Sequence, residues 1–130
     1  MRVYDDMLTI ERRISFLGEF GGLGHPVNEH LWRDSDRGRI AETKSKNWGY
    51  GGIADTETRE GLEKTYLGLM EKLGDYAAKG LSGSVYTQTT DVELEINGLM
   101  TYDRKVLKFN PAVLKAAHDA VIKKMKGMEK

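Results

Sequence analysis

The sequence has no cysteine, no excess of either charge and no long hydrophobic run. The lack of cysteine among 130 residues excludes disulfides, thiolate chemistry and cysteine-ligated zinc, although it leaves the cellular compartment open. Because 20 basic side chains balance 20 acidic ones, no net charge favours nucleic acid or an anionic membrane as a partner. No stretch approaches the roughly 18 apolar residues of a membrane-spanning helix. We therefore expect no nucleic-acid partner and no membrane partner.

The length of the chain sets a second limit. A chain of 130 residues suffices for one domain, whereas a complete β/α barrel needs about 250. The first residues, MRVYDD, are charged and show no apolar segment typical of a signal peptide. We expect a single domain over residues 1–130, with a charged tail over residues 123–130 that frays.

Local patterns predict a strand, a long loop and a helix in the first part of the chain. A short apolar run over residues 14–17 comes before glycines, which is typical of a buried strand entering a loop. Residues 21–55 are rich in Gly, Asp, Asn and charge, and they predict a long loop. Asp55 and Thr56 offer capping oxygens for a helix that ends before Gly80. Its expected buried stripe consists of Leu62, Tyr66, Leu69, Met70, Leu73 and Ala77.

Patterns in the second part of the chain predict a strand, a loop and a helix, in the same order as in the first part. Residues 82–90 are rich in β-branched and aromatic side chains, so we expect a strand, and Asn97-Gly98 marks a turn after it. Asn110 and Pro111 then open a last helix, as a capping side chain followed by proline. Its expected buried stripe consists of Val113, Leu114, Ala117, Val121 and Met125. The pattern indicates an α/β fold with two successive β/α units of a parallel sheet.

Two stretches resemble retaining β-glycosidases of glycoside hydrolase family 2, of the β-galactosidase type. The first, residues 16–24, reads FLGEFGGLG and is similar to the motif at the seventh barrel strand, in which the glutamate is the nucleophile. The second, residues 83–93 and 97–104, is similar to the eighth strand and the loop after it. The likeness extends over residues 11–108. It implies the last two β/α units of a (β/α)8 TIM barrel.

The resemblance also implies a hydrolase that cleaves the O-glycosidic bonds of β-linked sugars. Such an enzyme uses two carboxyl groups about 5 Å apart, one as nucleophile and one as general acid. It implies Glu19 as the nucleophile, since barrel active sites lie at the carboxyl ends of the strands; the alternative is a loop glutamate in a salt bridge. The family's general acid belongs to an Asn-Glu pair at the fourth strand, whereas Asn28-Glu29 follows the nucleophile. We therefore expect a chain that carries the nucleophile without the general acid.

Aromatic and polar side chains near the matched stretches are candidates for sugar contact. Trp32 and Trp48 can stack on sugar faces, or they can pin the long loop to the barrel. Tyr86, Gln88 and Thr89 lie near the end of the expected second strand, where they can hydrogen-bond sugar hydroxyls. Since alternation along a strand puts Tyr86 and Gln88 on one face, not every residue in this run can line the site.

No metal or cofactor site emerges from the remaining residues. Asp91 and Glu93 can bind loop backbone or a bridging cation, and we expect a structural role ahead of ligand contact. His25, His30 and His118 lack the spacing of metal ligands, and we expect His118 to be structural. The glycine-rich run after the first strand does not fit a nucleotide loop. We therefore expect no metal and no cofactor.

Two functions stay open at this point. The first is a retaining β-glycosidase, present here as half of a catalytic pair. The alternative is a non-catalytic carbohydrate-binding or subunit-docking module derived from the same barrel, which the missing second carboxylate favours for this chain alone. In either case we expect a β-linked sugar as ligand, together with self-association or pairing with the missing barrel portion.

Overall fold

Two parallel strands and two helices make up the regular structure. The computed structural model describes residues 14–32 and 56–127. The elements are β1 (Ser15–Gly21), α3 (Arg59–Ala78), β2 (Leu81–Thr87) and α4 (Pro111–Lys126). Their order confirms the expected α/β class with two parallel strands. Over the described ranges, neither helix is both long and apolar enough to cross a membrane.

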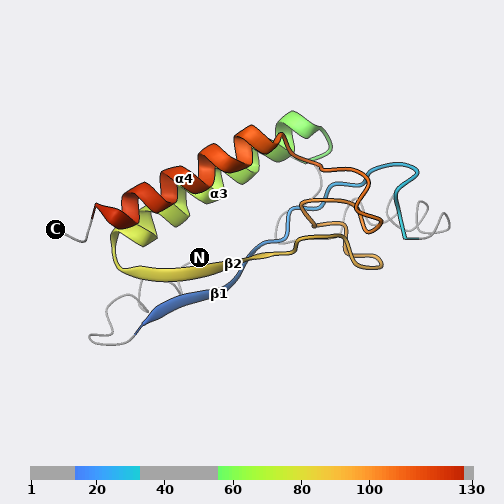
Figure 1. Cartoon of the computed structure of the whole chain (residues 1–130). Coiled ribbons are helices and arrows are strands. Elements are labelled where there is room, and N and C mark those ends of the chain that lie inside the picture. The colour runs from blue at the N-terminus through green and yellow to red at the C-terminus, as the bar shows by residue number, and fades with distance from the viewer. Residues whose placement is uncertain (1–13, 33–55, 128–130) are drawn as a thin grey trace.

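β1 and β2 lie side by side with their carboxyl ends at the same edge of the sheet (Figure 1). Gly21 of β1 pairs with Thr87 of β2 at that edge. The register shifts between Leu17 and Phe20, where β1 carries an extra residue. The strand limits differ from the expected ones: β1 extends through the glutamate motif to Gly21, and β2 ends at Thr87 rather than Thr90.

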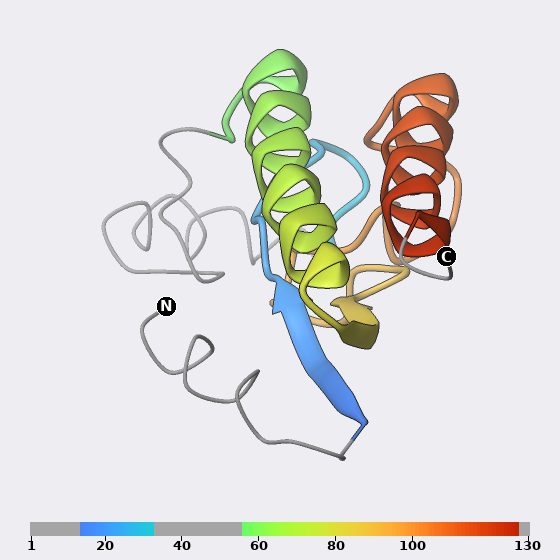
Figure 2. The same ribbon diagram turned by 90° about the vertical axis from the view of Figure 1, so that its left-hand side faces the viewer.

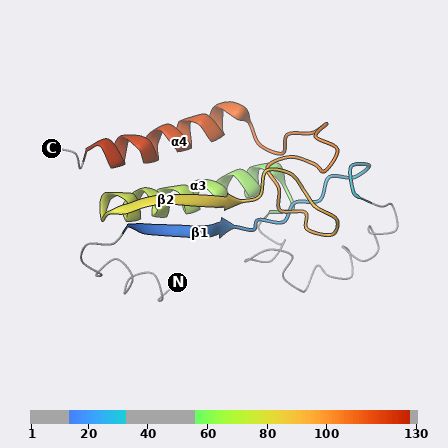
Figure 3. The ribbon, with the colours of Figure 1, turned by 60° about the horizontal axis from the view of Figure 1, so that its bottom comes forward.

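Both helices cover the same face of the sheet (Figures 1 and 3). The buried residues of α3 are Leu62, Tyr66, Met70, Leu73, Gly74 and Ala77, which confirms the expected stripe with Leu69 at its margin. Tyr66 lies at the centre of the core, with its ring centroid 5.0 Å from that of Phe109 and 5.4 Å from that of Tyr86. Its hydroxyl is 2.7 Å from His118 Nε2 of α4, so the expected structural role of His118 is confirmed.

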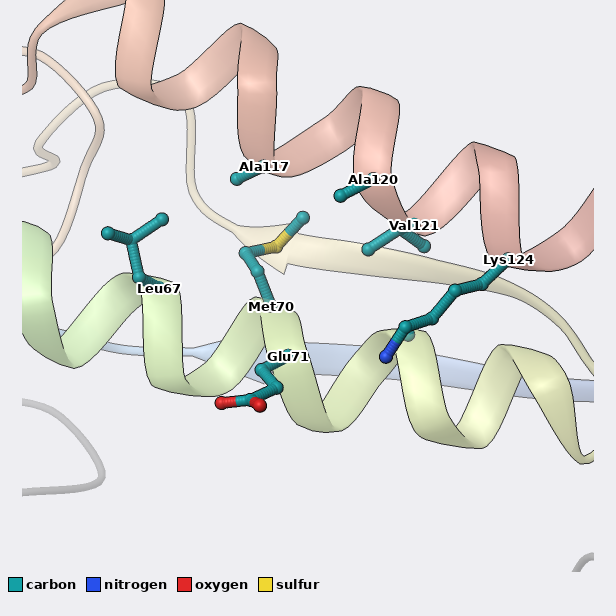
Figure 4. Close-up of a pocket in the computed structure, with 8 residues that line it drawn as sticks. Leu67, Met70, Glu71, Ala117, Ala120, Val121 and Lys124 are labelled. Atoms are coloured by element: carbon teal, nitrogen blue, oxygen red, sulfur yellow. The ribbon is translucent and has the colours of Figure 1, made fainter.

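α3 and α4 pack along each other (Figure 2) and leave an outer groove of about 190 Å³ between them (Figure 4). The groove is lined by Leu67, Met70, Glu71, Gly74, Ala117, Ala120, Val121 and Lys124. Lys124 reaches across it toward α3, and its Nζ donates to Asp75 Oδ1 at 2.7 Å. The groove therefore belongs to the helix side of the fold, not to the strand ends.

The start of α3 differs from the expected one. Its N-cap is Thr58, whose side-chain oxygen accepts a hydrogen bond from the Gly61 N–H at 3.0 Å. Thr56, one of the two expected caps, is buried, and its hydroxyl donates to the carbonyl of Gly24. This tertiary bond holds Thr56 in the loop, so the helix begins later. Asp55, the other expected cap, lies outside the described residues.

α4 begins as expected and, as its expected stripe implies, extends past Met125. The side chain of Asn110 accepts a hydrogen bond from the Ala112 N–H at 3.0 Å, and a proline occupies the first turn. The carboxyl end reaches into the charged tail that the sequence predicts to fray. Val121 packs against the core and Lys124 pairs with Asp75, so this turn is attached to α3.

Among residues 14–32 and 56–127, no helix or strand covers the sheet face opposite α3 and α4. Leu17 and Phe20 pack against the core, so the alternating Phe16 points to the other side, where it is 54% exposed. Val85 of β2 is 48% exposed, and Ile14, directly before β1, is 83% exposed. β1 and β2 each have one edge that no other described strand pairs with, and together with these side chains the edges form a surface suited to further strands.

We predict that the isolated chain self-associates, because a sheet of two strands, which is all that the described ranges contain, is rarely stable alone. Light scattering should show species larger than a monomer. Phe16→Lys should shift the chain toward the monomer, since a charge resists burial in the contact. Ile122→Lys changes a residue on α4 that is 48% exposed and should leave the association unchanged. A monodisperse wild-type monomer with a cooperative thermal transition would contradict this prediction.

Candidate functional site

Glu19 lies near the carboxyl end of β1, within the interval where the register shifts. Its side chain is exposed, whereas Leu17 and Phe20 on either side pack against the core. No salt bridge joins Glu19 to another described residue, so the alternative of a paired loop glutamate has no support within these ranges. Its carboxylate is therefore available to a ligand.

The two residues that follow Glu19 and Phe20 are glycines for a geometric reason. Gly21 and Gly22 have φ values of 106° and 67°, a conformation that side chains disfavour. A Cβ on Gly21 would also collide with the ring of Tyr86. The chain can therefore turn at Gly21 and Gly22, directly after Phe20, while it stays packed on β2.

The ends of both strands meet at one edge. The Gly22 N–H donates to the Thr87 carbonyl at 3.4 Å, which extends the pairing just past β1. Gln88 and Thr89 follow β2 directly, and the Thr87–Gln88 peptide bond is cis. The Gln88 side-chain amide donates to Asn97 Oδ1 at 2.9 Å. Gln88 and the exposed Thr89 thus lie at the same edge of the sheet as Glu19.

Tyr86 lies on the helix-facing side of β2. Its ring packs edge-on against Phe20 and Tyr66, each with a centroid distance of 5.4 Å. Its hydroxyl is buried without a hydrogen-bond partner among the described residues, and burial raises the pKa of Tyr86 well above its ordinary value. In this structure Tyr86 is part of the core, whereas Glu19 is exposed.

A buried ion pair organises the loop after β2. Lys108 Nζ donates to Asp91 Oδ1 at 2.6 Å and to the Ile96 carbonyl at 2.8 Å, and these two charged side chains are 0% and 4% exposed. Asp91 Oδ1 also accepts the Gly98 N–H at 2.8 Å, which confirms that Asp91 binds loop backbone. Burial pushes the pKa of Asp91 up and the pKa of Lys108 down, and the ion pair opposes both shifts.

His25 attaches the loop after β1 to this ion pair. Its backbone N–H donates to the Ile96 carbonyl at 2.9 Å, the same oxygen that Lys108 binds. Its ring Nδ1 is 2.7 Å from the Thr56 carbonyl. Burial lowers the pKa of His25, the bond to Thr56 opposes this shift, and the charge of Lys108 adds to it. The two loops therefore close on one another at a shared carbonyl.

A second contact joins the same two loops farther from the strands. His30 Nδ1 is 2.8 Å from Asp103 Oδ2. Asp103 Oδ1 accepts hydrogen bonds from Thr101 Oγ1 at 2.6 Å and from the Lys105 N–H at 3.1 Å. The Thr101 hydroxyl, the His30 ring and this N–H together hold the pKa of Asp103 well below its usual range. The residues of this contact were not anticipated from the sequence as partners.

Of the two tryptophans expected to contact a sugar, the structure describes Trp32. Trp32 is 48% exposed beside the His30–Asp103 contact, and its ring centroid lies 5.2 Å from that of Tyr102. Trp48 lies outside the described residues. Within residues 14–32 and 56–127, no group of three or more His, Asp or Glu side chains is arranged to hold a metal ion.

Comparison with models of known protein families finds no match to this chain, and no curated protein matches it. The geometry of the strand ends and the resemblance of the two stretches are therefore the grounds for assigning a function.

We predict that Lys108→Met destabilises the fold by about 3–5 kcal/mol, because Asp91 then stays buried without its partner. Chemical denaturation of the wild type and the variant measures the difference. Lys115→Met is the matched control, since the Lys115–Asp119 pair has side chains 76% and 58% exposed and should matter little. Equal effects of the two substitutions would show that the buried pair does not organise the loop.

We predict that stability falls between about pH 7.5 and pH 5 partly through His25. Its folded pKa lies below the unfolded value of about 6.5, so as pH falls through that value the unfolded chain takes up a proton that folded His25 resists. Thermal midpoints should therefore fall more in the wild type than in His25→Gln, which keeps a donor for the Thr56 carbonyl. His30 and His118 are present in both chains, so equal falls would rule out the contribution of His25.

Proposed function

We propose that this chain supplies the last two β/α units of a retaining β-glycosidase barrel of glycoside hydrolase family 2, with Glu19 as its nucleophile. The substrate would be a β-linked sugar, and the reaction hydrolysis of its O-glycosidic bond. The observation that carries the proposal is the parallel pairing of β1 and β2, which puts Glu19, Gln88 and Thr89 at one edge of the sheet. Active sites of β/α barrels form at this carboxyl edge.

In the proposed reaction, a carboxylate oxygen of Glu19 attacks the anomeric carbon and forms a glycosyl ester. The bond to the leaving oxygen breaks as a general acid protonates that oxygen. Water then cleaves the ester, with the former acid acting as base, and restores the Glu19 carboxylate. An ionised carboxylate only accepts hydrogen bonds, so it can attack without a base. The exposure of Glu19, unpaired with any other described residue, supports this role.

The backbone around Glu19 also supports the role of nucleophile. Leu17 and Phe20 anchor β1 in the core on either side of it, and the extra residue between them leaves Glu19 exposed. Bulges often occur next to active sites, where they redirect a side chain. The left-handed Gly21, packed against Tyr86, fixes where the strand ends. The position of a nucleophile has to be fixed within a fraction of an ångström.

The sheet face that no described element covers supports the barrel part of the proposal. In a β/α barrel, helices cover the outside of the sheet and the other face fills the interior with branched and bulky side chains. Phe16 and Val85 alternate with the core-packed Leu17 and Tyr86, so they lie on the side away from α3 and α4, where the side chains of further strands would bury them. The edges of β1 and β2 that no described strand pairs with would pair with strands on either side.

The described residues offer no general acid in the family's position. Glu29 is exposed in a turn after β1, with a φ of 68°, and Asp91 is engaged by Lys108. Because a retaining mechanism needs a second carboxyl group about 5 Å from the first, this chain alone favours the alternative of a carbohydrate-binding or docking module. The two functions differ in whether turnover appears when the remaining barrel units are supplied.

We predict that the isolated chain does not hydrolyse a nitrophenyl β-galactoside, because a general acid typically contributes about 10²–10⁴ in rate. Fusion to six upstream β/α units of a family 2 enzyme, which carry the Asn-Glu pair, should restore turnover. Glu19→Gln should then abolish it. Glu29→Gln is the matched control and should retain activity. Turnover of the isolated chain, or a restored enzyme that is indifferent to Glu19→Gln, would refute the proposal.

A further inference from the structure

The loop after β2 buries a chemically reactive dipeptide, Asn97-Gly98. Asn97 is 8% exposed and Gly98 is buried. In a mobile chain an Asn-Gly pair is prone to deamidation, because glycine has no side chain to hinder attack of its backbone nitrogen on the asparagine side chain. The structure therefore keeps a reactive pair away from solvent and in one conformation.

The packing of this loop requires glycine at position 98. A Cβ at this position would collide with the backbone of Thr90 and Asp91 and with the Met100 carbonyl. Because these neighbours are backbone atoms, no rotation of a side chain relieves the collision. The fold thus imposes the residue that makes Asn97 reactive.

Hydrogen bonds hold both groups that deamidation would join. The Gly98 N–H donates to Asp91 Oδ1 at 2.8 Å, and Asn97 Oδ1 accepts from Gln88 Nε2 at 2.9 Å. Directly after the pair, the Leu99 N–H donates to the Gln88 carbonyl at 3.0 Å. Ring closure needs the Gly98 nitrogen to turn toward the Asn97 side-chain carbon. That movement costs these bonds, so the closed loop opposes the reaction.

The ion pair between Lys108 and Asp91 controls this closure. Asp91 Oδ1 is the atom that accepts both from Lys108 Nζ and from the Gly98 N–H. Without Lys108, a buried Asp91 has to take up a proton or move to water. In either case the Gly98 N–H loses its charged acceptor. The reactivity of Asn97 is thus coupled to the ion pair.

We propose that Asn97 is a deamidation site that the closed loop protects and that opening of the loop exposes. In the reaction the Gly98 nitrogen attacks the carbonyl carbon of the Asn97 side chain, and the amide group leaves as ammonia with the Gly98 proton. Water then opens the resulting succinimide at either carbonyl and gives aspartate or isoaspartate. The co-reactant is water, and the proposal does not depend on the proposed glycosidase function.

The product of this reaction favours the open loop. An aspartate at position 97 adds a carboxylate close to Asp91, whose charge Lys108 already neutralises. Glu95 Oε2 lies 3.4 Å from the Gln88 amide that now binds Asn97, so the new charge also faces Glu95. Like charges at one site oppose burial of both. Isoaspartate in addition inserts a carbon into the backbone and shifts the pairing that follows. Deamidation therefore turns a transient opening into a lasting one.

Incubation of the full chain at mildly alkaline pH, followed by peptide mass spectrometry, tests this proposal. The wild type in buffer should form aspartate and isoaspartate at position 97 at least about tenfold more slowly than the same chain unfolded in urea, since opening of the loop costs free energy. Asn97→Gln should form no such product and identifies the peptide. Equal rates for the folded and the unfolded wild type would overturn the proposal, and this comparison requires no folded variant.

A pair of variants separates opening of the loop from unfolding of the whole chain. Lys108→Met breaks the ion pair, whereas Met70→Ala removes a buried side chain of α3 and serves as the matched control. At urea concentrations that give the two variants equal free energies of unfolding, Lys108→Met should deamidate faster. Equal rates would show that global folding alone protects Asn97, against the proposal. Amide hydrogen exchange at Leu99 should also be faster in Asn97→Asp than in the wild type, and unchanged exchange would contradict the proposed effect of the product.

Discussion

The bond between Lys108 and Asp91 is the interaction on which the shape of the candidate site depends. It joins the beginning of the loop after β2 to the segment that leads into α4, with both charges removed from water. The Ile96 carbonyl accepts from the same ammonium group and from the backbone of His25, so the loop after β1 closes on the same point. Buried ion pairs add little net stability, but they are costly to break. We infer that this one selects a single arrangement of the two loops.

This closure has two consequences at different distances from the strands. Close to the sheet, it keeps the residues after β1 and β2 together, just beyond the edge where the strand pairing places Glu19 and Gln88. Farther out, the His30–Asp103 contact joins the loops again and supports Trp32. Catalytic and binding residues are commonly carried on loops held by a rigid scaffold. The helices and the core around Tyr66 form that scaffold here.

Local patterns in the sequence predicted the elements and missed their ends. The α3 stripe followed from helical spacing, and Asn110 with its proline marked the start of α4, because both signals lie within a few residues. β1 is longer than predicted because Gly18 and Glu19 interrupt the apolar run while the bulge keeps the strand paired. The cap at Thr58 was missed because Thr56 is held by a tertiary bond to the first loop.

The contacts that build the site were beyond local patterns. Lys108 and Asp91 are 17 residues apart, and His30 and Asp103 are 73 apart, so no periodicity relates them. One weak signal was present: Lys108 stands alone between apolar neighbours, where a charge needs a partner. The position of Glu19 near the end of a strand could be predicted from the sequence, because the whole stretch around it forms a motif. The sequence could not predict which side of β2 Tyr86 occupies, because its packing against Phe20 and Tyr66 decides this.

A trapped glycosyl-enzyme tests the assignment of Glu19 as nucleophile most directly. A 2-deoxy-2-fluoro β-galactoside slows cleavage of the ester, so that the sugar stays on the attacking carboxylate of the restored barrel. Peptide mass spectrometry then locates it. The expected result is a label on the peptide that contains Glu19, lost in Glu19→Gln. Label on Glu29 or Glu93 would show that another carboxylate attacks, and label on no residue would favour a binding module without catalysis.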